Sequence, residues 1–150
     1  MMFVLDTNVL IYAVDDTSPY HAACRAFVER CRLQAGAWHL TWGIFYEYLR
    51  VATHPRICPR PLSAGEAWGF FEGMLRSPGL SMLAARERHA AVASEVLRET
   101  PGLSGNAMHD AETAILMREH GIKTIYTRDL GFHRFKFLDV VDPLTVEGRK

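Results

Sequence analysis

The sequence has no long apolar run, no net charge and only three lysines. None of its hydrophobic stretches approaches the roughly 20 residues that a membrane-spanning helix requires. The N-terminal segment acquires a charge at Asp6, which is too early for a signal peptide. Because the formal charge is zero, composition alone gives no sign of a polyanionic partner. We therefore expect a soluble, cytoplasmic protein that does not bind a membrane.

Cysteine is also scarce. The three cysteines are an odd number without a C-x-x-C pair, which argues against a disulfide framework and against a zinc site. Cys24 and Cys31 share a helical apolar stripe with Phe27 and Val28. Their thiols are therefore predicted to be buried as small hydrophobic groups.

The chain does contain enough apolar material for a folded core. A chain of 150 residues is long enough for one domain and short for two. Its 49% of hydrophobic residues argue against a disordered chain. We predict a single domain over residues 1–150.

Alternating strand and helix patterns predict an α/β fold. Apolar runs predict strands at 2–5, 37–42, 80–84, 123–127 and 137–141. Helical spacing predicts helices over 7–12, 19–36, 43–53, 63–75, around 92–97, and over 106–120. Ser63 and Glu66 have capping-box spacing, whereas the three prolines of 54–61 predict an exposed loop. This order implies a parallel central sheet with helices on both faces.

Two aspartates follow predicted strands. Asp6 comes directly after the first strand, and Asp129 comes just after the strand at 123–127. In open α/β sheets, ligands bind outside the carboxyl ends of the strands. Ordinary alternatives exist for each residue taken alone, because Asp6 also suits a helix cap and Asp129 a turn.

Glu47 is a third candidate, and it lies inside a predicted helix. It is the only acid between Glu29 and Glu66, and it shares a helical row with Ile44 and Val51. A partly buried carboxylate requires a cation. That cation is either Arg50, three residues further along the helix, or a metal ion.

Asp110 is the fourth candidate, in the first turn of the last long helix. The helix dipole favours an acid at this place, which is the structural explanation for it. However, Asp110 borders the packing face formed by Ala111, Ala114 and Ile115. This position is expected to direct the carboxylate toward the sheet.

Convergence of the four acids would have a clear chemical consequence. Two unit charges ~4 Å apart repel by about 4 kcal/mol even at an effective dielectric constant of 20. Such a cluster either retains protons or binds divalent cations, and oxygen ligands favour Mg²⁺ or Mn²⁺ over zinc. Metal ions held in this way can activate water for phosphodiester hydrolysis.

Four segments of the sequence resemble the signatures of one family, the PIN-domain ribonucleases of the VapC toxin type. The resemblance runs from about Phe3 to Leu144 and keeps the order of the signatures. The matching segments are Val4-Leu5-Asp6-Thr7-Asn8-Val9-Leu10-Ile11-Tyr12, Phe45-Tyr46-Glu47-Tyr48-Leu49-Arg50, His109-Asp110-Ala111 followed by Glu119-His120-Gly121, and Thr127-Arg128-Asp129 with Phe132 and Arg134-Phe135. It implies a PIN-like three-layer α/β fold.

The resemblance also implies a catalytic site. It implies that Mg²⁺ or Mn²⁺ is bound, directly or through water, by Asp6, Glu47, Asp110 and Asp129. Asn8 and Thr127 would orient the carboxylates, and hydrolysis would leave a 5′-phosphate and a 3′-hydroxyl. Many relatives have a further aspartate at the position of Gly131, so a single resident ion is as consistent with this sequence as two.

Partners follow from the same resemblance. It implies an endoribonuclease toxin that forms a homodimer and is inhibited by a cognate antitoxin, whose arginine could reach the acidic site. Its RNA substrate (tRNA, rRNA or mRNA) is not distinguished by the sequence. Candidate contacts to RNA phosphates are Arg56, Arg60, Arg128 and Arg134.

Two other functions compete with this prediction. An aspartyl phosphatase would also place Asp6 after a strand, but that class needs a second aspartate where this chain has Asn8. A catalytically silent RNA-binding or scaffold domain would use the same acids only to neutralise arginines. A neighbouring reading frame for a small antitoxin would favour the toxin over the scaffold.

Overall fold

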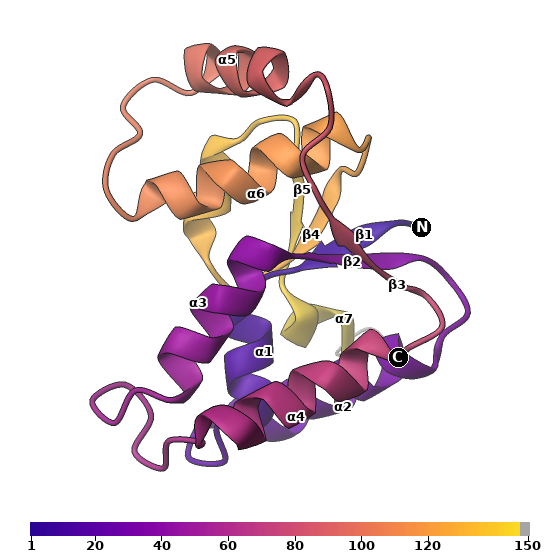
Figure 1. Cartoon of the computed structure of the whole chain (residues 1–150), viewed down its shortest axis with the longest axis vertical. Coiled ribbons are helices and arrows are strands. Elements are labelled where there is room, and N and C mark those ends of the chain that lie inside the picture. Colours follow the sequence, from indigo (N-terminus) through magenta and orange to yellow (C-terminus); the bar gives the residue numbers. More distant parts are fainter. Residues whose placement is uncertain (148–150) are drawn as a thin grey trace.

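A five-stranded, fully parallel sheet forms the centre of the molecule. We describe residues 1–147 of a computed structural model; positions 148–150 of the predicted domain lie outside the described residues. The strand order is β3-β2-β1-β4-β5, and every neighbouring pair is parallel (Figure 1). The strands are β1 (Phe3–Leu5), β2 (Trp38–Thr41), β3 (Leu80–Leu83), β4 (Thr124–Tyr126) and β5 (Asp139–Val141). The predicted α/β class is therefore confirmed.

The helices match the predicted pattern, with shifts at their ends. They are α1 (Thr7–Val14), α2 (His21–Leu33), α3 (Trp42–Ala52), α4 (Ala64–Leu75), α5 (His89–Glu99), α6 (Ala107–Glu119) and α7 (Pro143–Glu147), with the 3₁₀ helix η1 (Leu130–Arg134). Two of these elements, η1 and α7, were not predicted. Trp42 belongs to α3 instead of the preceding strand, because the Thr41 hydroxyl caps that helix by accepting from Ile44 N at 3.0 Å.

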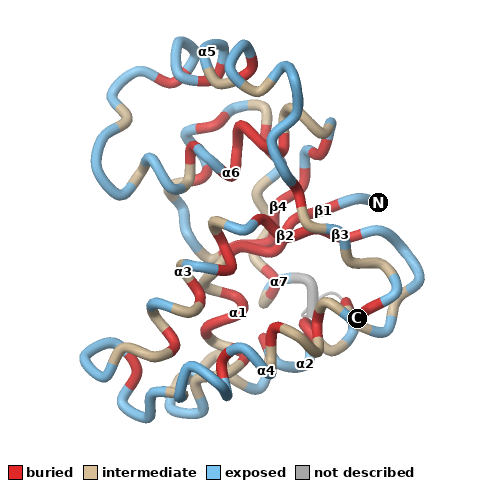
Figure 2. Tube along the Cα trace, in the orientation of Figure 1, coloured by how far each residue is buried: buried red, intermediate tan, exposed pale blue. Residues whose placement is uncertain are grey.

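The helices cover both faces of the sheet. Helices α5 and α6 lie on one side, and α1, α2, α4 and α7 lie on the other (Figure 1). Burial is concentrated in the strands and in the helix faces turned toward them (Figure 2). The largest fully buried side chains include Trp38, Tyr48, Phe71, Phe132 and Phe135. This core explains why the central strands read as continuous apolar runs.

Three local predictions are also confirmed, and they concern the start of α4, the proline-rich loop and the burial of Cys24 and Cys31. The Ser63–Glu66 capping box is formed in both directions, and 54–61 contains neither helix nor strand. The three cysteines are buried and form no disulfide. Among the described residues, no helix is long and apolar enough to cross a membrane.

The strand order creates one topological switch point. The chain proceeds from β1 outward to β2 and β3, and then crosses to β4 and β5 on the other side of β1. Ligands of open α/β sheets bind at such a place, beyond the carboxyl ends of the strands. Asp6 follows β1 there, and Thr127 follows β4.

Candidate active site

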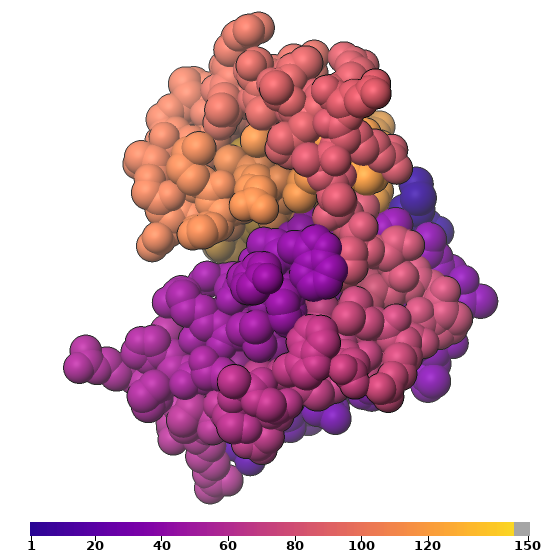
Figure 3. Space-filling view, viewed as in Figure 1, coloured from indigo at the N-terminus to yellow at the C-terminus, as the bar shows by residue number. Residues whose placement is uncertain are grey.

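A cavity of about 900 Å³ opens at this switch point. Its walls are formed by α1, α3 and α6 and by the segment that contains η1. In the space-filling view, a hollow separates the purple surface of α3 from the orange surface of α6 (Figure 3). The cavity is lined by all four acids singled out from the sequence, namely Asp6, Glu47, Asp110 and Asp129.

Asp6 is the most buried of these acids, with 8% of its surface exposed. Its backbone N–H donates to Tyr126 O at 3.0 Å, which continues the pairing of β1 with β4. Its Oδ1 accepts from Thr7 N at 2.8 Å and so caps α1. Asp6 therefore combines the structural role of a helix cap with a place in the cavity wall.

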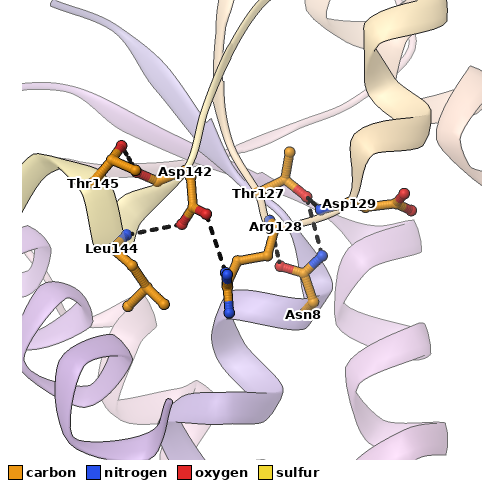
Figure 4. A network of polar contacts seen from close by, with 7 residues as sticks. All are labelled: Asn8, Thr127, Arg128, Asp129, Asp142, Leu144 and Thr145. Atoms are coloured by element: carbon orange, nitrogen blue, oxygen red, sulfur yellow. Dashed lines mark hydrogen bonds and ion pairs between the residues drawn. The ribbon is translucent and has the colours of Figure 1, made fainter.

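A hydrogen-bond network around Thr127 fixes the second carboxylate oxygen of Asp6. The Thr127 hydroxyl donates to Asp6 Oδ2 at 2.7 Å and accepts from Asp129 N at 2.9 Å. Asn8 Nδ2 donates to Thr127 Oγ1 at 3.0 Å and to Asp6 Oδ2 at 3.2 Å. Figure 4 shows how Asn8 and Thr127 bridge the start of α1 and the segment after β4. These two residues thus have the geometry needed to orient acids at the site.

Burial, with a smaller contribution from neighbouring acids, raises the pKa values of Asp6 and Asp110. Burial, reinforced by the charges of Asp110 and Asp129, raises the pKa of Asp6 to about 7 against the hydrogen bonds from Thr127 and Thr7. Burial and Asp129 raise the pKa of Asp110 to about 6, although Arg134 and His109 oppose the rise. Asp6, Asp110 and Asp129 are therefore close enough to act as one electrostatic cluster.

Glu47 lines the same cavity but already has a cationic partner. Arg50 Nη2 and Nε donate to its carboxylate at 2.6 and 3.1 Å. This pair lowers the pKa of Glu47 against the effect of burial. The sequence allowed either Arg50 or a metal ion as the partner of Glu47, and the structure shows Arg50.

Sequence reasoning missed one acid of the cavity wall, Glu112. Its carboxylate lies against Gly43, where an added Cβ would come within 2.7 Å of Glu112 Oε1. Glu112 is exposed, and its helical position alone resembles that of any surface glutamate. Only the close approach of α3 and α6 brings it into the cavity, and no sequence spacing encodes that approach.

The four arginines proposed as RNA contacts lie in different surroundings. Arg134 lines the cavity. Arg128 points away from Asp129 toward Asp142, which it contacts at 3.2 Å (Figure 4). Its guanidinium also lies 4.0 Å from the centroid of the Tyr20 ring. Arg60 forms an exposed ion pair with Asp16 at 3.3 Å, and Arg56 is exposed on the loop beside Ile57, which lines the cavity.

The donor chemistry of the cavity fits a divalent cation. Carboxylate oxygens are the ligands that Mg²⁺ and Mn²⁺ prefer. A cation would favour the ionised carboxylates against the burial and the mutual repulsion that raise the pKa values of Asp6 and Asp110. Asp6, Asp110 and Asp129 are the residues that would hold it. Within residues 1–147, however, no three histidine, cysteine or acidic side chains are already placed around one ion position. The acids therefore line one cavity, but they are not yet arranged around a single ion position.

Comparison with known proteins assigns the family. A family model described as the PIN domain matches residues 3–138, which include every acid of the cavity. The chain belongs to the PIN-domain family, in its VapC branch. Ribonuclease VapC48 of Mycobacterium tuberculosis is 31% identical to this PIN domain over 145 residues, which cover 97% of the chain and 99% of the relative. Ribonuclease VapC24 of the same organism is 33% identical over 152 residues, with 98% and 100% covered.

Solved structures agree with this PIN-domain fold. VapBC2 from Rickettsia felis, solved with a DNA fragment from its promoter, has a TM-score of 0.66 at 15% identity and covers 93% of this chain and 97% of that chain. VapC20 of Mycobacterium tuberculosis, described as a toxin that cleaves the sarcin–ricin loop, has a TM-score of 0.63 at 16% identity, with 89% and 93% covered. The resemblance found in the sequence is thereby confirmed for family and fold.

Proposed function

We propose that residues 1–150 form a single PIN domain that is a divalent-metal-dependent endoribonuclease and the toxin of a VapBC-type toxin–antitoxin module. The observation that carries this proposal is the electrostatic cluster of Asp6, Asp110 and Asp129 in one cavity at the topological switch point. The relatives named as VapC ribonucleases support it, since they match almost the whole chain.

The chain's own residues would prepare the site for a cation. Asp6, Asp110 and Asp129 would hold Mg²⁺ or Mn²⁺, with Glu47 joining them once its carboxylate leaves Arg50. When bound, the cation supplies Lewis acidity and a water of lowered pKa for attack on phosphorus. Thr127 and Asn8 would keep the Asp6 carboxylate aimed into the cavity through their hydrogen bonds to Oδ2.

The cavity would admit a segment of RNA backbone. Its volume of about 900 Å³ falls within the range of pockets that bind small organic ligands, so it has room for a nucleotide with its flanking phosphates. The cleaved bond would leave a 5′-phosphate and a 3′-hydroxyl. Arg56, Arg60, Arg128 and Arg134 remain proposed contacts to RNA phosphates, and of these four Arg134 lines the cavity.

Partners are part of the same proposal. Several structural neighbours are VapBC complexes of toxin with antitoxin, including VapBC-1 from nontypeable Haemophilus influenzae and VapBC from Salmonella typhimurium. By analogy, this chain would act in the cytoplasm as a homodimer that an antitoxin holds inactive. An antitoxin arginine placed between the carboxylates would substitute for the charge of the metal.

The proposal is tested by cleavage of a panel of structured RNAs by the purified protein with Mg²⁺, Mn²⁺ or EDTA. Asp6→Asn and Asp129→Asn serve as site variants, and Glu95→Gln on the exposed face of α5 is the matched control. We expect cleavage with either metal, none with EDTA, and a loss of at least 100-fold in both site variants alone. Equal cleavage by native protein and both site variants would contradict the proposal.

One observation favours the catalytically silent alternative, namely that no three potential metal ligands of residues 1–147 surround one ion position. A folded protein that binds RNA but cleaves none of the panel with either metal would support this second function.

A further inference from the structure

Arg134 closes η1 at the wall of the acidic cavity. Its Nε donates to Gly131 O at 2.8 Å, which fixes the base of the guanidinium group. Its positive charge opposes the rise in the pKa of Asp110, so the guanidinium acts on that carboxylate. The wall of this mostly acidic cavity therefore contains a positively charged side chain, Arg134, close to the acids.

Gly131 lies at the centre of this arrangement. An added Cβ at Gly131 would come 3.3 Å from Arg134 Nη2, 3.0 Å from Asp129 Oδ1 and 3.6 Å from Asp110 Oδ2. The guanidinium and the two carboxylates therefore surround the space left by the missing side chain. Gly131 N also donates to Asp129 Oδ1 at 2.8 Å, which fixes that acid beside the same space.

The other arginines near the site, unlike Arg134, already form ion pairs with carboxylates. Arg50 is held in two hydrogen bonds by Glu47, and Arg128 is held by Asp142. Arg134 makes no ion pair among residues 1–147, and its one hydrogen bond uses Nε. Its two terminal nitrogens therefore remain available to an anion that enters the cavity.

We propose that Arg134 binds the nonbridging oxygens of the phosphodiester that is cleaved, and that Gly131 leaves the guanidinium of this chain free for that role, because a carboxylate at that position would lie beside Arg134 Nη2. This inference rests on the proposed ribonuclease function and assigns a substrate-binding residue to it. A planar guanidinium matches two phosphate oxygens. Fixed beside the acids, it would also stabilise the negative charge that grows on those oxygens as the nucleophile attacks.

The first experiment measures single-turnover cleavage of one RNA substrate by the native protein, Arg134→Gln and Arg134→Lys at saturating Mg²⁺. Arg98→Gln, an exposed arginine of α5, is the control for loss of a charge. We expect the maximal rate to fall about 100-fold in Arg134→Gln and to recover in part in Arg134→Lys, with melting temperatures within about 2–3 °C of native, as for an exposed substitution. Maximal rate and KM of Arg134→Gln within twofold of native would overturn the proposal.

A second pair of variants tests the role of Gly131 without altering Arg134. Gly131→Asp adds a carboxylate beside the guanidinium, whereas Gly131→Asn adds an uncharged group of nearly the same size. We expect Gly131→Asp to lose at least ten times more of the maximal rate than Gly131→Asn does. Equal rates in the two variants would show that Arg134 is not captured and would contradict the mechanism.

Binding distinguishes a failure of this inference from a failure of the proposed function. Fluorescence anisotropy would follow the same RNA bound to Asp6→Asn protein, with and without Arg134→Gln, over a series of KCl concentrations. Loss of one phosphate contact should reduce the slope of log affinity against log salt by about 0.7 for single-stranded RNA. If the native protein cleaves nothing, the ribonuclease proposal fails. The binding data test Arg134 separately, because a salt slope that Arg134→Gln leaves unchanged would overturn the assignment of this residue.

Discussion

Replacement of Asp6 by asparagine should make the stability of the metal-free protein fall less steeply as the pH rises. Asp6 is buried and lies near two other acids, so its pKa in the folded state is about 7 against 3.8 for the free side chain. The unfolded chain loses this proton first as the pH rises. Stability is therefore lost between pH 3.8 and about 7, because the folded state must either keep the proton or bear a buried charge.

The size of the effect follows from the two pKa values. A difference of about three units corresponds to about 4 kcal/mol once both states are ionised, and to roughly 1.7 kcal/mol at pH 5. The native protein should thus lose about 2.5 kcal/mol between pH 5 and pH 8 through this residue alone. The Asp6→Asn variant would be spared this loss. Asparagine caps a helix as well as aspartate does, so the contact from Thr7 N to the side chain can persist.

Thermal unfolding in EDTA at pH 5 and pH 8 measures this difference. For a chain of this size, about 2.5 kcal/mol corresponds to a change of roughly 5–10 °C in melting temperature. We therefore expect the melting temperature of Asp6→Asn minus that of the native protein to be larger at pH 8 than at pH 5 by this amount. Glu95→Gln, at an exposed position, should show no such change. Adding Mg²⁺ or Mn²⁺ at pH 8 should raise the melting temperature of the native protein more than that of Asp6→Asn. A difference between native and Asp6→Asn that is the same at both pH values would refute the electrostatic reasoning.

Other consequences of the structure can be checked separately. Thr127→Ala removes the donor to Asp6 Oδ2 and the acceptor for Asp129 N; we expect RNA cleavage to fall roughly 10–100-fold, with recovery in Thr127→Ser, as measured by initial rates. Ser63→Ala breaks the capping box of α4 and should cost about 1 kcal/mol of unfolding free energy in urea titrations, without altering cleavage. Gly79→Ala should cost about 1–3 kcal/mol in the same titration, since its Cβ would collide with the backbone carbonyl of Gly36, whereas Gly43→Ala meets only the movable end of Glu112 and should cost far less.

Much of the fold could be predicted because its signals are local. Buried parallel strands such as β1 and β4 give short apolar runs, and the glycines, prolines and caps between them divide the helices. The two elements that were missed are short. For α7 a signal was present, because Asp142 precedes Pro143 and its side chain accepts from Leu144 N at 2.9 Å, a typical helix start.

The site was predictable only in part, because its chemistry depends on directions that spacing does not give. Asp6 and Asp129 could be found at strand ends, since topology brings those ends together. Arg128 precedes Asp129, but neighbouring side chains of an extended segment point to opposite sides, and Arg128 accordingly reaches Asp142 instead of the cavity. Sequence spacing also could not decide whether Glu47 pairs with Arg50, because that contact depends on the rotamers and packing of both side chains.

The cavity acids are spread over most of the chain, at positions 6, 47, 110 and 129. Because Asp6 acquires its surroundings only when β4 pairs with β1 and Thr127 reaches its carboxylate, a nascent polypeptide that ends before β4 has no complete site. For the proposed ribonuclease, this arrangement has a consequence during translation. The ribosome that makes the protein, and the messenger it reads, would not be exposed to an active enzyme until β4 and Thr127 have been synthesised.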